Sequence, residues 1–88
     1  MQNTLREEYR KVLAEIYDSL IKKKEGVDVN KLAKELGIDW DTLAAYIKYL
    51  NDRGYIIAKV LPGNPPSKIA DIRILEVTPL GRDTIENS

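Results

Sequence analysis

The fold is decided by residues 29–56, which read VNKLAKELGIDWDTLAAYIKYLNDRGYI. Apolar side chains recur at intervals of three and four on both sides of Gly37, which is the spacing of amphipathic helices. Gly37 can take the left-handed conformation that ends a helix, and the Asp39 carboxylate can accept hydrogen bonds from backbone N–H groups of the next helix. The stretch therefore predicts a short helix from Val29, a tight turn, and a helix from Trp40 to Asp52.

Upstream, the same spacing predicts a longer helix from Asn3 to Lys24. Thr4, or Asn3 before it, is a candidate cap for its first turn. The consecutive lysines at positions 22–24 suit the negative end of the helix, and Gly26 is expected to stop it.

Downstream of Gly54 the apolar period shortens to about 2, so residues 55–61 are predicted to form a strand. The proline-rich segment 62–67 cannot continue a ladder and predicts an exposed turn, followed by a return strand over residues 69–77. These two strands form a hairpin.

The return strand has a slip in its alternation. Ile72 and Ile74 fall on one face, whereas Leu75 and Val77 fall on the other, which predicts a bulge or bend. After the strand, Thr78 and a proline at the first helical position predict a short last helix carrying Leu80 and Ile85.

Composition limits the chemistry. Eighty-eight residues allow one domain, and the chain has no cysteine and no histidine. We therefore expect no enzymatic activity, no metal site and no cofactor, and no small-molecule ligand is evident. Fourteen basic residues balance fourteen acidic ones, so any nucleic-acid surface must be local. No segment is long and apolar enough to cross a membrane and no signal peptide is evident, so we expect a cytoplasmic protein.

Three helices with a tight turn, then a hairpin, is the order of a winged helix-turn-helix domain. The motifs LAKELGID at 32–39, IKYL at 47–50, NDRGYI at 51–56 and TPLGR at 78–82 resemble winged-helix transcription regulators of the MarR, ArsR and PadR kind. The resemblance implies one α+β domain over residues 1–88. It also implies a small regulator that reads double-stranded DNA, with the third helix in the major groove and the wing on the adjacent backbone or minor groove.

The outward side of the third helix is predicted to carry Asp41, Ala45, Lys48 and Asp52, with Ala44 near its rim. DNA-reading members of that family usually carry arginines at the start of this helix, whereas DWDTLAAY at 39–46 has none. The wing would reach DNA through its own cations. The candidate DNA-binding residues are Lys31, Lys34, Trp40, Asp41, Thr42, Ala45, Lys48, Tyr49, Lys68 and Arg73.

Other interpretations stay open at this point. The cations can be ordinary solvated charges balanced by nearby acids. Trp40 can be a lid over the core beside Tyr55. The alternative function is a winged-helix protein-interaction module that uses Trp40, Tyr46 and Tyr49 as an aromatic contact surface.

The first helix has a wide apolar stripe. Because it is longer than the helices behind it, its first turns are expected to project past the winged core. A two-fold homodimer packed through Leu5, Tyr9 and Val12 would cover these turns and match palindromic operators. In a monomer, the wing and the last helix would have to cover the same stripe.

Overall fold

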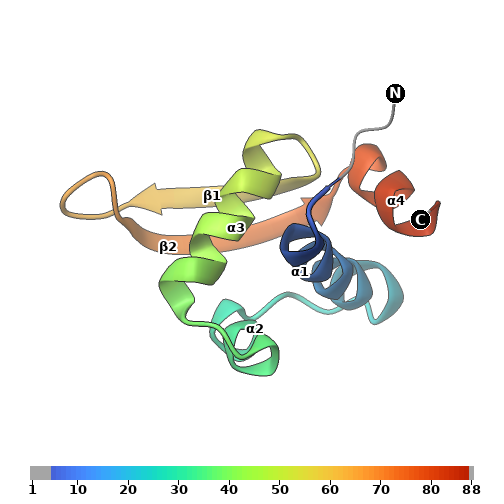
Figure 1. Ribbon diagram of the computed structural model, residues 1–88, viewed down its shortest axis with the longest axis horizontal. Helices are drawn as coiled ribbons and strands as arrows, with labels where there is room; N and C mark the ends of the chain where they lie inside the picture. Colours follow the sequence, from blue (N-terminus) through green and yellow to red (C-terminus); the bar gives the residue numbers. More distant parts are fainter. Residues whose placement is uncertain (1–4, 88) are drawn as a thin grey trace.

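The computed structural model describes residues 5–87 and contains four α-helices and one antiparallel hairpin (Figure 1). The elements in chain order are α1 (Glu7–Tyr17), the π-helical turn η1 (Asp18–Lys22), α2 (Val29–Leu36), α3 (Trp40–Asp52), β1 (Ile56–Pro62), β2 (Ile69–Val77) and α4 (Pro79–Glu86). Helices, then the hairpin, then a last helix confirm the predicted α+β class and are consistent with a winged helix. No helix within residues 5–87 is long and apolar enough to span a bilayer.

The first helix is shorter than predicted at both ends. Arg6 has an extended backbone and occupies the N-cap position without a capping side-chain hydrogen bond, while Asn3 and Thr4 lie outside the described residues. At the other end the helix widens, since the Lys23 backbone N–H donates to the Asp18 carbonyl five residues back. Lys24 then takes a positive φ of 57°. The helical hydrogen bonding therefore ends before Gly26, which does not terminate it.

The turn between α2 and α3 is confirmed. Gly37 has φ 69°, in the left-handed region where a Cβ would be strained. The Asp39 carboxylate caps α3 by accepting from the Thr42 backbone N–H at 3.3 Å. Asp28, which the sequence did not single out, caps α2 by accepting from the Lys31 backbone N–H at 3.2 Å. Gly37 and the Asp39 cap define the turn before α3, whereas the Asp28 cap fixes the start of α2.

The hairpin contains the predicted bulge. Ile57 lies opposite Glu76 and Ala58 lies opposite Ile74, so Leu75 is an extra residue on β2. Because Leu75 is accommodated as a bulge and does not take a regular place in the ladder, Val77 stays on the core face, where it is buried. The expectation that Val77 shares the outer face with Leu75 is therefore wrong.

The core lies between α1, α3 and the inner face of the hairpin. Its most completely buried side chains are Leu13, Ile16, Leu43, Ile47, Leu50, Ile56 and Val12. The last helix closes one end, because Gly81 packs so closely on the Tyr55 carbonyl that a Cβ there would overlap it. The Thr78 hydroxyl accepts from the Gly81 backbone N–H at 3.1 Å, which confirms the predicted cap of α4.

The predicted dimer seam is buried inside one chain. Leu5 is 6% exposed and Val12 is 1% exposed. The Tyr9 ring stacks on the Tyr49 ring of α3, with centroids 4.1 Å apart. The expectation that the first turns project past the core is wrong, because α1 packs against both α3 and α4. The homodimer itself stays a prediction, without the seam assigned to it.

Candidate nucleic-acid interface

The outer face of α3 is built as the helical period predicts. Asp41, Ala45, Lys48 and Asp52 are all exposed along it. Ala44 differs from the expectation, because it is 1% exposed and lies within the core instead of at the rim. Its position between Leu43 and Ile47 puts it on the buried side of the helix. The face therefore presents one small side chain, Ala45, between charged neighbours.

Lys48 is paired within its own helix. Its ammonium lies 2.9 Å from an Asp52 carboxylate oxygen, one helical turn away, and both side chains are about half exposed at 54% and 56%. The pair neutralises the positive charge that the sequence assigned to DNA contact. The i,i+4 spacing of Lys48 and Asp52 was visible in the sequence, and the interpretation of Lys48 as a free cation overlooked it.

A groove separates α3 from the wing. Asp41, Ala44 and Ala45 line it from α3, and Ser67, Lys68 and Ile69 line it from the wing, around a volume of about 280 Å³. Lys68 is exposed and supplies the positive charge on the wing side. The helix and the wing therefore share one open surface at this point.

Arg73 does not share that surface. It lies directly across the ladder from Lys59, between the buried residues Ile72 and Ile74, so its side chain points away from the core face. The hairpin packs its core face on α3. The structure thus separates Lys68 and Arg73, which the sequence had grouped as the cations of the wing.

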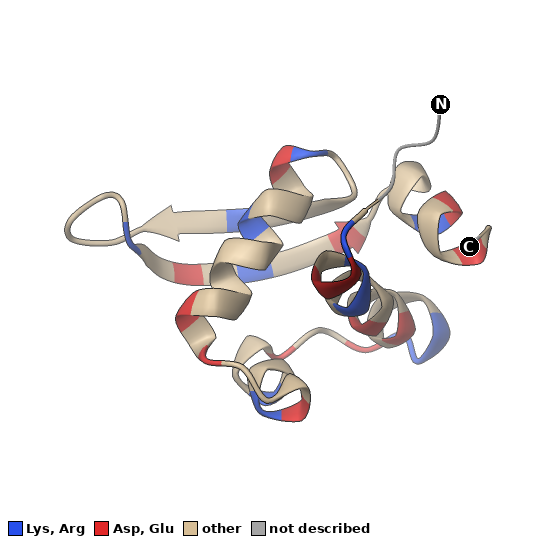
Figure 2. Cartoon of the chain, viewed as in Figure 1, with Lys and Arg blue, Asp and Glu red and all other residues tan. Residues whose placement is uncertain are grey.

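The two cations predicted on α2 are exposed but are not brought to the groove. Lys31 borders another hollow, with residues of α1 and the loop that precedes α2. Lys34 lies in the last turn of α2. Figure 2 shows basic and acidic residues interspersed along the helices and strands of the described residues.

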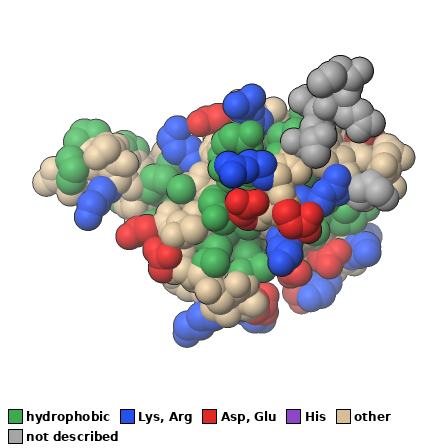
Figure 3. All heavy atoms as spheres, in the orientation of Figure 1, with side chains coloured by type: hydrophobic (Ala, Val, Ile, Leu, Met, Phe, Trp, Pro, Cys, Tyr) green, Lys and Arg blue, Asp and Glu red, His purple; other side chains and the backbone are tan. Residues whose placement is uncertain are grey.

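Aromatic contacts occupy several of the remaining candidates. The Tyr9 ring contacts Tyr46 edge-on at 5.0 Å and Tyr49 face-on at 4.1 Å, and the Arg53 guanidinium lies 5.0 Å from the Tyr49 centroid. Tyr46 and Tyr49 thus help to join α3 to α1. Figure 3 shows hydrophobic side chains reaching the surface of this side of the molecule among charged ones.

Trp40 and Thr42 have structural tasks at the start of α3. Trp40 is half-buried and packs against the core, but it does not lie beside Tyr55 as expected, because α3 is about 20 Å long and separates them. The Thr42 hydroxyl donates to Asp39 at 2.6 Å. That hydrogen bond lowers the pKa of Asp39, so the capping carboxylate stays ionised to a lower pH than an ordinary aspartate.

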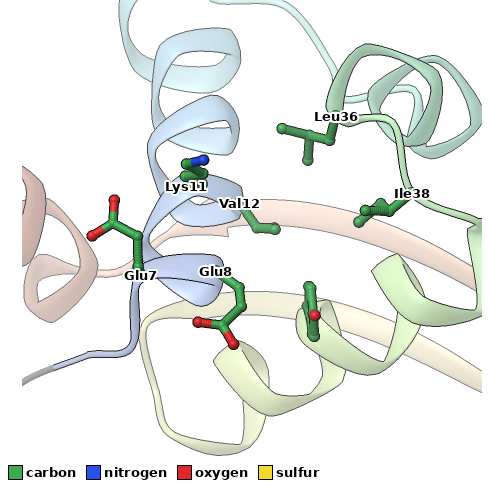
Figure 4. Close-up of a pocket in the computed structure, with 7 residues that line it drawn as sticks. Glu7, Glu8, Lys11, Val12, Leu36 and Ile38 are labelled. Carbon is green, nitrogen blue, oxygen red and sulfur yellow. The ribbon is translucent and has the colours of Figure 1, made fainter.

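A second hollow, of about 380 Å³, lies between α1 and the segment leading into α3. Figure 4 shows Leu36 and Ile38 on one side facing Val12, with Glu8 and Lys11 on the α1 side. The sequence had not indicated this cleft. Within residues 5–87, no three acidic or metal-ligating side chains gather closely enough to hold a metal ion.

No family model, curated protein or solved structure matches this chain. The surface geometry and the sequence motifs are therefore the basis for assigning a function.

Proposed function

We propose that this protein binds double-stranded DNA, with α3 in the major groove and the wing on the adjacent backbone, and that it acts as a small transcription regulator in the cytoplasm. The observation that carries the proposal is the groove in which Asp41 and Ala45 of α3 face Lys68 of the wing. A duplex lying on α3 would meet Lys68 at the same time. The resemblance of the helix-turn-helix motifs to winged-helix regulators supports this placement.

Only some of the exposed side chains on α3 can contact DNA bases. Ala45 is small enough for close approach and can contact a thymine methyl group, while Asp41 can accept from a cytosine amino group. Lys48 can reach a phosphate or a guanine once it leaves Asp52. Since this face has no arginine, we expect modest affinity for DNA and recognition of only a short base sequence.

The positive charge available to the duplex is small. Lys48 and Lys68 border the proposed surface, and each neutralised phosphate contributes about 0.9 to the slope of log affinity against log salt. Because Lys48 is paired with Asp52, we expect a slope of about −1 from Lys68 in the unmodified chain, steepening to about −2 only where Lys48 is freed. A strongly basic DNA-binding domain would show a much steeper one.

The protein-interaction alternative needs Trp40, Tyr46 and Tyr49 as a free aromatic surface. The rings of Tyr46 and Tyr49 contact Tyr9 within the chain, and Trp40 is half-buried. No contact in the described residues favours this alternative over DNA binding.

The test is titration of a fluorescent duplex, read by anisotropy between 50 and 200 mM salt. Lys68→Ala should weaken binding and reduce the salt slope by about 1, and Lys48→Ala should weaken binding because it leaves the Asp52 carboxylate unpaired beside the duplex. Lys23→Ala is a matched control, because Lys23 is exposed and lies on a different hollow. Arg73→Ala is a second control, on the outer face of the hairpin. An equal loss in all four variants, or no binding at 50 mM salt, would refute the proposal.

A further inference from the structure

The outer face of the hairpin, opposite the core, combines apolar and charged side chains. We call it the outer hairpin face, and it consists of Ile57, Lys59, Leu61, Asp71, Arg73, Leu75 and Glu76. Among the described residues, four large hydrophobic side chains are prominently exposed, and three of them are on this face: Ile57 at 44%, Leu61 at 47% and Leu75 at 51%. Gathering exposed apolar side chains on one small surface is typical of a contact site.

The charges of this face are not satisfied within the chain. Lys59 and Arg73 are direct cross-strand partners, and like charges in this position repel each other. Neither cation forms an ion pair with any residue from 5 to 87, and neither do Asp71 and Glu76. The face therefore holds two cations and two carboxylates that a matching surface could pair.

We propose that the outer hairpin face binds the same face of a second copy of this chain, in a two-fold antiparallel arrangement. Successive residue pairs on one face of a hairpin are about 6.8 Å apart along the strands. A two-fold axis that crosses the strands midway between the Lys59–Arg73 pair and the Ile57–Glu76 pair superposes one pair on the other. Arg73 of each copy then faces Glu76 of the other copy.

The dimer generated by this axis also covers the apolar side chains. Leu75 lies between the two pairs, so it meets Leu75 of the second copy close to the axis. The aliphatic stem of Lys59 lies over Ile57 of the second copy. Two symmetric Arg–Glu pairs thus flank a central leucine contact, as an isologous interface requires.

Other arrangements of the two faces are poorer. A two-fold axis parallel to the strands would place Lys59 opposite Arg73 of the other copy, and these like charges would repel each other. A shift by one residue pair toward the wing tip would pair Arg73 with Asp71 but leave Ile57 and Leu75 in water. The selected register is the one that pairs charges and also covers apolar surface.

Two short strands provide less than the ~800 Å² per partner of a standard interface, so the dimer should be weak. We expect it to be populated at about 1 mM, well above the concentrations of a binding assay. The inference rests on the hairpin alone and holds whether or not the protein binds DNA.

Charge exchange tests the register. At about 1 mM, sedimentation equilibrium of the unmodified chain should give a mean mass above that of the 10.0 kDa monomer. Arg73→Glu and Glu76→Arg should each abolish the excess, because each creates two like-charged contacts. An equimolar mixture of the two variants should restore it as a heterodimer, since both contacts are then attractive. All substituted side chains are exposed, and circular dichroism checks that each variant folds.

A matched control carries the same exchanges on α2, as Lys34→Glu and Glu35→Arg, and should leave the mean mass unchanged. A monomeric unmodified chain at this concentration would overturn the inference. So would a dimer whose mean mass is unchanged by Arg73→Glu and by Glu76→Arg. A mixture that stays monomeric would overturn the proposed register.

Discussion

Replacing Asp52 tests how α3 meets DNA more directly than removing Lys48. The Lys48 ammonium is held 2.9 Å from the Asp52 carboxylate, so DNA has to compete with that carboxylate for it. Asp52→Asn removes the competitor and one negative charge from the proposed surface. We therefore expect the variant to bind DNA more tightly than the unmodified chain.

The size of the gain has two parts. A phosphate that approached the Asp52 carboxylate to about 7 Å would be repelled by roughly 0.6 kcal/mol in water, so removing the carboxylate is expected to raise affinity about threefold. Lys48, once free, can neutralise one more phosphate, and that contact changes affinity by about 3.5-fold between 50 and 200 mM salt. Asp52→Asn should therefore strengthen binding about threefold to tenfold at 50 mM salt and steepen the salt slope by about 0.9.

The fold should tolerate this substitution. An exposed i,i+4 ion pair contributes only about 0.3 to 0.5 kcal/mol to the free energy of unfolding. Asp52 is also the last residue of α3, where a negative charge opposes the helix dipole by about 0.3 to 1 kcal/mol. The two effects offset each other, so a change in DNA affinity is not caused by unfolding.

The assay is duplex anisotropy on Asp52→Asn, Lys48→Ala and the double variant, each at two salt concentrations. In the double variant the steeper slope should disappear, while the gain from reduced repulsion should remain. Asp83→Asn, an exposed position on α4, is the control for a general change in net charge. A steeper slope that survives in the double variant would show that Lys48 does not contact DNA, and an unchanged affinity in Asp52→Asn would remove α3 from the interface.

Three further predictions concern stability. Tyr9→Ala removes the ring contacts with Tyr46 and Tyr49, so it should lower the free energy of unfolding in urea titration by about 1 to 3 kcal/mol without changing the oligomeric state. A variant that keeps its stability but changes its oligomeric mass would show that Tyr9 lies in a dimer interface. Gly81→Ala should lower the free energy of unfolding by about 1 to 3 kcal/mol or more, because the added Cβ overlaps the Tyr55 backbone. Gly26 has open space around it, so Gly26→Ala should change the free energy of unfolding by no more than about 0.5 kcal/mol. Equal melting temperatures of the two variants would contradict this prediction. The Tyr17 hydroxyl lowers the pKa of Glu86 by donating a 2.6 Å hydrogen bond to its carboxylate. The stability from this contact is therefore present above the ordinary glutamate pKa of 4.5 and is lost as the pH falls through the lowered value. In acid unfolding curves, Glu86→Gln should reduce this loss of stability.

The parts of the fold that could be predicted are those with local causes. Gly37 and Asp39 set the turn before α3 through their own backbone and side-chain chemistry, and Thr78 caps α4 in the same way. The slip in alternation at Leu75 located the bulge, because side chains of a strand alternate between two faces. Each of these signals involves residues within a few positions of one another.

The parts that could not be predicted depend on distant contacts. Tyr9 is amphipathic and lies on the edge of the apolar stripe, so nothing in α1 alone indicates that it stacks on Tyr49 forty residues later. The start of α1 likewise follows from Arg6, whose extended backbone no local motif requires. For the candidate site, helical period placed Asp41, Ala45 and Lys48 correctly on the exposed side of α3, whereas the shared groove with Lys68 required the position of the wing.

The bulge at Leu75 connects the core to the outer hairpin face. If Leu75 were absent, the order Ile72, Arg73, Ile74, Glu76, Val77 would alternate without interruption between the inner and outer faces. The core therefore does not need the extra residue, since its buried positions would keep their phase without it. What Leu75 adds is an exposed apolar side chain beside Ile57, at the position that separates Arg73 from Glu76. The bulge thus places an exposed leucine between two opposite charges, which is the apolar contact that the proposed interface of the outer hairpin face requires.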